Sequence, residues 1–387
     1  MRNRKYFHIK IAIDTRMGHT RVGMGVYVRG LLNGLAKIDK ENDYYIIINK
    51  NKKEDFVPIQ DNFHKIYTGV TYSDYLRRDF WEQVYLPLKL LKSKINVYHG
   101  PNYVLPVLTR AGKVLTIYDM TLFDSSKWYK PISRLRVQKL IKLSTKKANK
   151  IIAGSKNTKQ DIIKILKLPC DKIKVIYIGI DDIYSPIADK YKLGNIKNKY
   201  KIDSKFILHV GSLQARKNIP RLIEAYSKLP VELLEKYQLV IAGKRSWKVE
   251  KIFAKVKQLK LEDRVVFTGF VADDDLPLLM NAAALLAFPS LYEGFGIPPL
   301  EAMACGTPVV ASNTSSIPEV VGDAALLFDP YNVEEITEAM YRVLTDEQLR
   351  DKLRQRGIER VKQFSWENAA RETLQVYKEV YNSIRKL

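Results

Sequence analysis

The chain has 387 residues, 46% of them hydrophobic, and its 65 lysines and arginines against 42 aspartates and glutamates give a formal net charge of +23. This length suggests two domains, and the hydrophobic content excludes a disordered chain. The two cysteines, Cys170 and Cys305, stand far apart and in no metal-ligand spacing. They argue against a disulfide scaffold or a structural zinc and fit a cytoplasmic protein.

The positive charge is concentrated in the first half of the chain. Residues 1–200 hold 39 lysines and arginines against 17 aspartates and glutamates, whereas residues 201–387 hold 26 against 25. Such a basic half can be a solvated surface, or it can face an anionic membrane, an anionic acceptor or nucleic acid. A membrane or an anionic acceptor is favoured over nucleic acid, since no nucleic-acid-binding motif is present.

Short apolar runs alternate with helical patterns from the N-terminus onward. The run 9–13 is interrupted by Lys10 and is too short for a signal peptide, so we expect a buried strand, and no apolar segment is long enough to span a membrane. Further strands are predicted at 44–49, 97–99, 113–117, 151–153 and 174–178, and helices at 26–38 and 131–148. This alternation predicts a mostly parallel sheet covered on both faces.

The second half repeats the pattern. Strands are predicted at 206–210, 238–242, 265–268, 284–288, 308–311 and 325–328, and helices at 221–228, 249–259, 275–281, 299–304, 333–345 and 346–362. The polar stretch 189–203 is the expected boundary, giving α/β domains 1–190 and 200–365, and a last helix in 366–387 is expected to cross back to the first domain. Two doubly wound sheets would leave a cleft, with binding sites at the carboxyl ends of their strands.

A glycine loop between two glutamates is the most informative segment. It runs Glu-Gly-Phe-Gly-Ile-Pro-Pro-Leu-Glu from Glu293 to Glu301, after a predicted strand and before a predicted helix. Glycines let the backbone approach a ligand, prolines suit a first helical turn, and a helix N-terminus attracts phosphate. The carboxylates can accept hydrogen bonds from sugar and ribose hydroxyls. Without a ligand, the same pattern is an ordinary strand-to-helix turn.

Two adjacent cations form the second candidate element. Arg216 and Lys217 follow the predicted strand 206–210 and precede a helix. Arginine can bind a phosphate with two hydrogen bonds and lysine adds a point charge, so the pair can neutralise a diphosphate leaving group. Taken alone, the pair also fits the surface of a basic protein.

Together these elements resemble the retaining nucleotide-sugar glycosyltransferases of family 4, which have the GT-B fold of two Rossmann-like domains facing across a cleft. Glu293 and Glu301 match the family's E-x7-E motif, and the resemblance is tightest over residues 206–330. Further matches are Ala-Met-Ala-Cys-Gly-Thr-Pro-Val-Val-Ala-Ser at 302–312, Pro-Glu-Val at 318–320 and the glycine loop Val-Gly-Met-Gly-Val-Tyr at 22–27.

The resemblance implies roles for these residues. Arg216 and Lys217 would hold the donor diphosphate, Glu301 the ribose and Glu293 the transferred sugar. The other expected donor-binding residues are Gly211, Ser212, Gly269, Phe270 and Val271, the loop residues Gly294, Phe295, Gly296 and Ile297, and Gly23 and Gly25 from the first domain.

One position departs from the family pattern. Many members have a His-Asp pair after the strand corresponding to 113–117, where this chain has Tyr118 and Asp119. A phenol forms hydrogen bonds but is no cation near pH 7, so Asp119 is the predicted catalytic member and the role of Tyr118 on the acceptor side stays open. His99 ends a predicted strand and is a second acceptor-side candidate.

The resemblance also implies retention of anomeric configuration. Front-face displacement is favoured, in which the leaving diphosphate takes the acceptor proton and domain closure excludes water. Asp273, Asp274 and Asp275 are interpreted as caps of helix 275–281, so no obligatory metal or other cofactor is expected. Ser155 is predicted to be an N-cap and His209 a core residue.

The substrates are left open. The donor is expected to be GDP-mannose or a UDP-sugar, with a preference for GDP-mannose from a general resemblance to bacterial mannosyltransferases, and the acceptor a glycan or lipid-linked oligosaccharide. The stretch 75–94 mixes aromatic, leucine and basic residues, and is either an amphipathic surface for an anionic membrane or a core helix with basic ends. A nucleotide-sugar epimerase, a glycan phosphorylase and a nucleic-acid-binding protein are the alternatives; the oligomeric state is not indicated.

Overall fold

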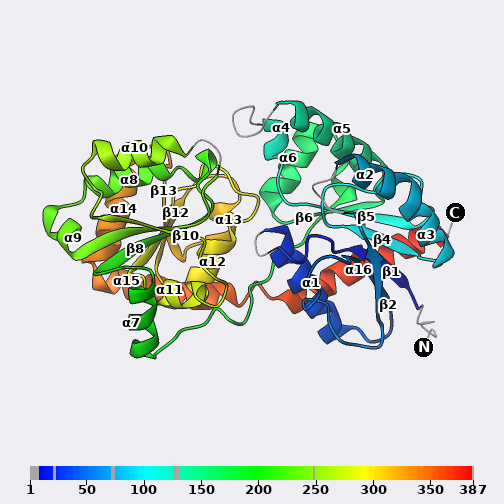
Figure 1. Cartoon of the computed structure of the whole chain (residues 1–387), viewed down its shortest axis with the longest axis horizontal. Coiled ribbons are helices and arrows are strands. Elements are labelled where there is room, and N and C mark those ends of the chain that lie inside the picture. Colours follow the sequence, from blue (N-terminus) through cyan, green and yellow to red (C-terminus); the bar gives the residue numbers. More distant parts are fainter. Residues whose placement is uncertain (1–7, 21–22, 71–74, 125–130, 247–248, 386–387) are drawn as a thin grey trace. The chain divides into compact units, whose positions relative to one another are not determined.

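The computed structural model describes residues 8–20, 23–70, 75–124, 131–246 and 249–385; the basic N-terminal residues and Val22 of the glycine loop lie outside these ranges. The chain divides into two compact units. Unit 1 comprises Met1–Gly179 and Ser365–Leu387, and unit 2 comprises Ile180–Phe364. Each unit has a parallel sheet with helices on both faces (Figure 1).

Within the described residues, the sheet of unit 1 has seven strands in the order β3-β2-β1-β4-β5-β6-β7, all paired in parallel. Its strands are β1 (Lys10–Asp14), β2 (Asp43–Asn49), β3 (Phe63–Thr68), β4 (Val97–Gly100), β5 (Gly112–Ile117), β6 (Lys150–Ala153) and β7 (Ile173–Val175). Its helices are α1 (Met24–Ile38), α2 (Tyr75–Phe80), the π-helix η1 (Trp81–Tyr85), α3 (Leu86–Lys92), α4 (Thr121–Asp124), α5 (Pro131–Lys147), α6 (Lys156–Leu166), η2 (Cys170–Lys172) and α16 (Trp366–Arg385).

The described part of unit 2 has a six-stranded parallel sheet in the order β10-β9-β8-β11-β12-β13. Its strands are β8 (Lys205–Val210), β9 (Tyr237–Ala242), β10 (Val265–Gly269), β11 (Leu285–Phe288), β12 (Val309–Ser312) and β13 (Ala325–Phe328). Its helices are α7 (Lys190–Lys199), η3 (Ala215–Lys217), α8 (Ile219–Ser227), α9 (Val231–Lys236), α10 (Glu250–Gln258), α11 (Leu276–Ala282), α12 (Ile297–Ala304), α13 (Ile317–Val321), α14 (Val333–Thr345) and α15 (Glu347–Val361).

Each sheet is apolar on both faces because helices cover both. In β9 every residue is buried, which is typical of a central parallel strand. In unit 1, alternate residues of β1 point to opposite sides, so Ala12 joins the core beneath Trp81 and Leu90 while Ile11 and Ile13 face the other helical layer. The two-sheet α/β architecture expected from the sequence is therefore confirmed.

The expected domain boundary at 189–203 is wrong. Those residues include α7, which belongs to unit 2 and packs against α11, and the division falls at Gly179 and Ile180 instead. The segment is polar because Ile196 is the one buried residue of α7, so a surface helix has the composition of a linker. The long C-terminal helix α16 belongs to unit 1 and packs along α1.

Candidate active site

Two cations follow the first strand of unit 2. β8 ends at Val210, and the chain turns into η3, which carries Arg216 and Lys217. The Lys217 side chain is buried, whereas the Arg216 side chain is 21% exposed. Both cations therefore lie at the carboxyl edge of the sheet, where parallel α/β folds bind ligands.

Glu293 joins these cations into one cluster. Lys217 Nζ donates to Oε1 of Glu293 at 2.5 Å, and Arg216 Nη1 donates to Oε2 at 2.6 Å. Burial raises the pKa of Glu293, but the charges of Lys217 and Arg216 outweigh burial and hold that pKa at about 2. Glu293 is thus ionised near neutral pH, and one carboxylate between two cations leaves one net positive charge.

The glycine loop is fixed by two serines. Glu293 N donates to Ser315 Oγ at 2.9 Å, and Ser316 Oγ lies 2.8 Å from the carbonyl oxygens of both Glu293 and Phe295. Gly296 has φ 107°, a backbone conformation that would be strained for a residue with a side chain. It is the N-cap of α12, and no side chain forms a capping hydrogen bond there. Pro298 and Pro299 have no backbone N–H, so at the N-terminus of α12 the N–H groups of Gly296 and Ile297 are the ones that can bind an anion.

Glu301 lies on α12 and is buried. It is hydrogen-bonded to Tyr184, and burial, followed by the nearby charges of Asp181 and Asp273, raises the pKa of Glu301 to about 8 against the opposing effect of Tyr184. The same burial and the neighbouring Glu301 raise the pKa of Tyr184 above its ordinary value. Tyr184 and Asp181 were missed in the sequence because no local pattern links them to α12.

The start of the loop that leads from β8 to η3 is fixed by the neighbouring strand. Gly211 N donates to the carbonyl oxygen of Ala242 at 2.9 Å, and Gln214 N donates to that of Ser212 at 2.7 Å. A Cβ added to Gly243 would lie 1.9 Å from the carbonyl oxygen of Gly211, so only glycine fits there. Gly211 and Ser212 are therefore held at the end of β8.

The expected donor-binding residues Gly269, Phe270 and Val271 lie at the carboxyl end of β10. Gly269 has φ 70° and ends the strand, and Val271 is buried. The ring of Phe270 is 43% exposed, with Lys244 Nζ 4.4 Å from its centre. An exposed aromatic face beside a cation is a surface on which a base can stack.

Unit 1 holds the remaining predicted residues. Gly23 is the N-cap of α1 at φ 45°, and Gly25 is buried where a Cβ would lie 1.9 Å from the carbonyl oxygen of Thr20. Asp119 Oδ1 accepts hydrogen bonds from the backbone N and Oγ1 of Thr121, at 3.0 and 2.5 Å. Tyr118 Oη donates to the carbonyl oxygen of Pro101 at 2.9 Å. Both side chains of the pair are thus oriented by their own unit.

Two family models together match most of the chain. "Glycosyltransferase Family 4" matches residues 22–183 and "Glycosyl transferases group 1" matches residues 194–360. The chain is 38% identical over 285 residues to "O-antigen chain mannosyltransferase B" of Escherichia coli, an alignment that covers 73% of this chain and 74% of that protein. This chain belongs to the group 1 glycosyltransferases.

Other comparisons agree with this assignment. "Serotype-specific mannosyltransferase WbdA" of Escherichia coli is 37% identical over 227 residues, which span 58% of this chain but 28% of that longer protein. The solved structure of Anabaena Alr3699/HepE in complex with UDP and glucose has a TM-score of 0.75 at 19% identity, covering 96% of this chain and 100% of that one. The expected GT-B fold is confirmed, and the epimerase and nucleic-acid-binding alternatives are not supported.

His99, the second acceptor-side candidate, does not present its ring at the surface of unit 1. It is fully buried, with Nδ1 2.7 Å from Tyr377 Oη and Nε2 2.8 Å from Thr116 Oγ1. Burial lowers the pKa of His99 to about 3, so it is neutral. Its contact with Tyr377 places its ring on the α16 side of the sheet. His209 is a core residue as expected, and Ser155 caps α6 as expected.

The capping role expected of the aspartates is not observed at Asp275. It occupies the N-cap position of α11 but makes no side-chain capping bond. Its carboxylate instead accepts from Lys199 Nζ at 2.6 Å and Tyr200 Oη at 2.7 Å, and so fastens α7 to α11. In the described ranges, no three histidine, cysteine, aspartate or glutamate side chains are grouped to hold a metal ion.

A buried polar network at the end of β1 was also missed in the sequence. Arg16 donates to both carboxylate oxygens of Asp14, at 2.9 and 2.6 Å, and to Glu82 Oε1 at 2.5 Å. Glu82 lies in the π-helix η1, a rare irregularity that often occurs at functional sites. The network ties η1 to the chain that leads towards Gly23.

Proposed function

We propose that this glycosyltransferase transfers mannose, with retention of configuration, from GDP-mannose to a glycan or lipid-linked oligosaccharide in surface polysaccharide synthesis. The names of the two Escherichia coli relatives support mannose as the sugar. The structurally similar Anabaena protein binds UDP, so a UDP-sugar is the alternative donor.

The observation that carries the proposal is the pairing of Glu293 with both Arg216 and Lys217. Two cations held by one carboxylate keep a net positive charge beside the N-terminus of α12. Both features bind phosphate. Glu301, about one turn into α12, offers a carboxyl group that can bind the ribose. Phe270 offers an exposed ring on which the base can stack.

The proposed reaction breaks the bond between the anomeric carbon and the diphosphate oxygen. The acceptor hydroxyl attacks from the same face, its proton passes to the departing phosphate oxygen, and GDP leaves. Negative charge grows on the diphosphate in this step, so Arg216 and Lys217 stabilise the transition state more than the ground state. Glu293, being ionised, can accept hydrogen bonds from sugar hydroxyls while it orients both cations.

Calorimetric titration with GDP, UDP, ADP and dTDP in the presence of EDTA tests the donor site. We expect GDP to bind, and Arg216→Ala or Glu301→Ala to weaken binding at least about tenfold, because each variant removes a hydrogen-bonding partner of the nucleotide. Lys228→Ala, which removes an exposed lysine of the same unit, is the matched control. With GDP-mannose and acceptor, Lys217→Ala should lower kcat about a hundredfold.

The outcomes separate the parts of the proposal. Binding of UDP in place of GDP would show that the donor carries uridine rather than guanosine, and the proposed donor site would still stand. Binding that needs magnesium or manganese would contradict a metal-free site. Wild-type turnover in Lys217→Ala would reject the electrostatic role, and no binding of any nucleotide would reject the donor site itself.

A further inference from the structure

A stripe of exposed apolar side chains runs along one side of unit 1. α2, η1 and α3 follow one another without interruption (Figure 1), and their inner side packs Trp81, Leu86 and Leu90 into the core. Their outer side exposes large apolar residues by 45–66%, spaced four, four and three apart, which places them on one helical face. These residues, called the apolar face below, are Phe80, Val84, Leu88 and Leu91.

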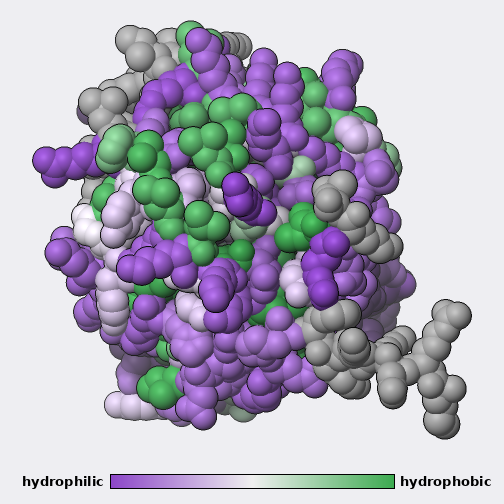
Figure 2. All heavy atoms as spheres, turned by 90° about the vertical axis from the view of Figure 1, so that its right-hand side faces the viewer, coloured by the Kyte–Doolittle hydropathy of each residue, from purple (hydrophilic) through white to green (hydrophobic). Residues whose placement is uncertain are grey.

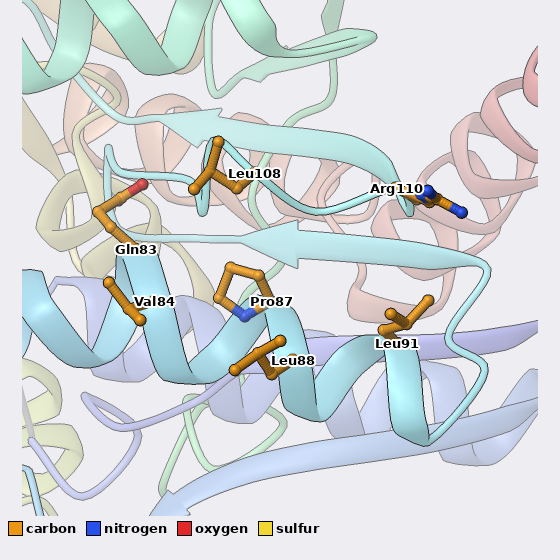
Figure 3. Close-up of a pocket in the computed structure, with 7 residues that line it drawn as sticks. All are labelled: Gln83, Val84, Pro87, Leu88, Leu91, Leu108 and Arg110. Atoms are coloured by element: carbon orange, nitrogen blue, oxygen red, sulfur yellow. The ribbon is translucent and has the colours of Figure 1, made fainter.

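A loop from the other side completes this face. Leu108, 74% exposed, lies across from the helix, and between them is a cavity of about 250 Å³ (Figure 3). Its walls come from Val84, Pro87, Leu88 and Leu91 of the helix and Leu108 of the loop. Gln83 fastens the loop, since its side chain donates to the carbonyl oxygen of Leu105 at 3.0 Å and accepts from Val107 N at 2.9 Å. These hydrogen bonds hold the loop with Leu108 against the helix that carries the apolar face.

The segment that carries most of this face has basic but no acidic residues, and Asp79, next to Phe80, is paired with Arg78 and Arg136. From residue 83 to residue 118 the sequence has no aspartate or glutamate but five lysines and arginines. Of these, Lys92, Lys94 and Arg110 are exposed, and none of the three forms an ion pair with a carboxylate of the described residues. Glu82, next to the stretch, is buried against Arg16 and does not offset this charge at the surface.

We propose that the apolar face docks on an anionic lipid bilayer, with its leucines at the headgroup boundary and Lys92, Lys94 and Arg110 against the headgroups. A bilayer surface offers apolar depth and negative charge together, which is the combination that this face matches. Figure 2 looks at this side of unit 1 and shows hydrophobic side chains gathered among hydrophilic ones. No helix in the described part of the chain combines the length and hydrophobicity to cross a bilayer.

Other occupants match the face less well. The cavity is smaller than most small-molecule pockets, and its lining is apolar apart from Gln83, which is engaged with the loop, and Arg110. Lysine is depleted from protein interfaces, which disfavours a protein partner on a face bordered by Lys92 and Lys94. The docking goes beyond the sugar transfer itself and does not depend on which donor is used.

Co-sedimentation of the full chain with vesicles tests the proposal. Vesicles of phosphatidylcholine alone and with 30% phosphatidylglycerol (about a third, enough for a clear surface potential) are compared at low and high salt. Leu88→Glu is paired with Val231→Glu, an equally exposed apolar residue of unit 2. The triple variant Lys92→Gln, Lys94→Gln, Arg110→Gln is paired with Lys251→Gln, Lys257→Gln, Lys260→Gln, which removes the same charge from unit 2.

We expect binding to the anionic vesicles that weakens with salt, falls about tenfold in Leu88→Glu and about a hundredfold in the first triple variant, and changes little in either control. GDP titration on each variant shows that unit 2 remains folded and separates this test from the donor proposal. Equal loss in both triple variants would mean that only net charge matters and would overturn the assigned face. Absence of vesicle binding, or dimerisation in ultracentrifugation that Leu88→Glu abolishes, would also overturn it.

Discussion

The two glutamates of the same motif are held in opposite protonation states. Glu293 meets two cations and its pKa falls to about 2, whereas Glu301 meets a phenol and two further carboxylates and its pKa rises to about 8. At neutral pH, Glu293 is therefore a carboxylate and Glu301, eight residues later, is a carboxylic acid. The difference arises from their neighbours, since both side chains are similarly buried.

The raised pKa of Glu301 predicts a pH-dependent stability. An unfolded glutamate releases its proton near pH 4.5, whereas folded Glu301 keeps its proton to about pH 8. The contribution of Glu301 to the free energy of unfolding is therefore fully present below pH 4.5 and is lost as the pH rises to 8. Glu301→Gln stays neutral throughout. We expect it to change Tm little at pH 5 and to raise Tm by about 3 °C or more at pH 8. Thermal melts at both pH values, with Glu235→Gln as an exposed control, measure this, and an equal effect at both would contradict it.

At the scale of single elements, burial decides what could be predicted from the sequence. β9 is buried throughout and forms an apolar run, so it was predicted within a residue. β3 was missed because it is an edge strand with one solvent-facing side, which brings His64 and Lys65 into its sequence. The sequence of α7 resembles a polar linker because this helix exposes most of its surface.

The candidate site divides in the same way. Arg216, Lys217, Glu293 and Glu301 lie in contiguous motifs at strand-to-helix turns, where local sequence determines the geometry, and the structure brings the first three together. The bond between Glu301 and Tyr184, and the burial of His99 against α16, depend on segments far apart in the sequence. Periodicity carries no information about such contacts.

Alanine substitution is expected to have opposite effects on stability at two glycines, one packed at the contact between α1 and α16 and one exposed in α7. Gly30 faces Trp366 so closely that a Cβ would lie 1.9 Å from Cε2 of the indole. We expect Gly30→Ala to destabilise the protein by about 1–3 kcal/mol, because the ring must move out of a packed interface. Gly194, in the exposed helix α7, has open space around its Cβ position, so Gly194→Ala should stabilise by about 0.5–1 kcal/mol. Urea unfolding of both variants measures the two signs, and a neutral Gly30→Ala would show that α16 shifts freely on α1.

At the scale of the whole molecule, two separate cores are joined within one chain. Unit 1 is closed by its own C-terminal helix, and the chain crosses between the units at Gly179–Ile180 and again at Phe364–Ser365. The excess positive charge lies in the half that forms unit 1, whereas the side chains proposed to bind the nucleotide, Arg216, Lys217, Phe270 and Glu301, lie in unit 2. Membrane contact and donor binding are thus assigned to different units.

This division predicts that donor nucleotide stabilises one unit selectively. Calorimetry should resolve two unfolding transitions, since each unit has its own core. GDP at a hundred times its Kd should stabilise unit 2 by about 2.7 kcal/mol and raise its transition by about 5–10 °C, leaving the other in place. Gly30→Ala identifies the second transition, because it should lower only the one that belongs to unit 1. A single transition that GDP and Gly30→Ala both move would mean that the two cores unfold as one cooperative unit, and the assignment of donor binding to unit 2 would then rest on the variants at Arg216 and Glu301.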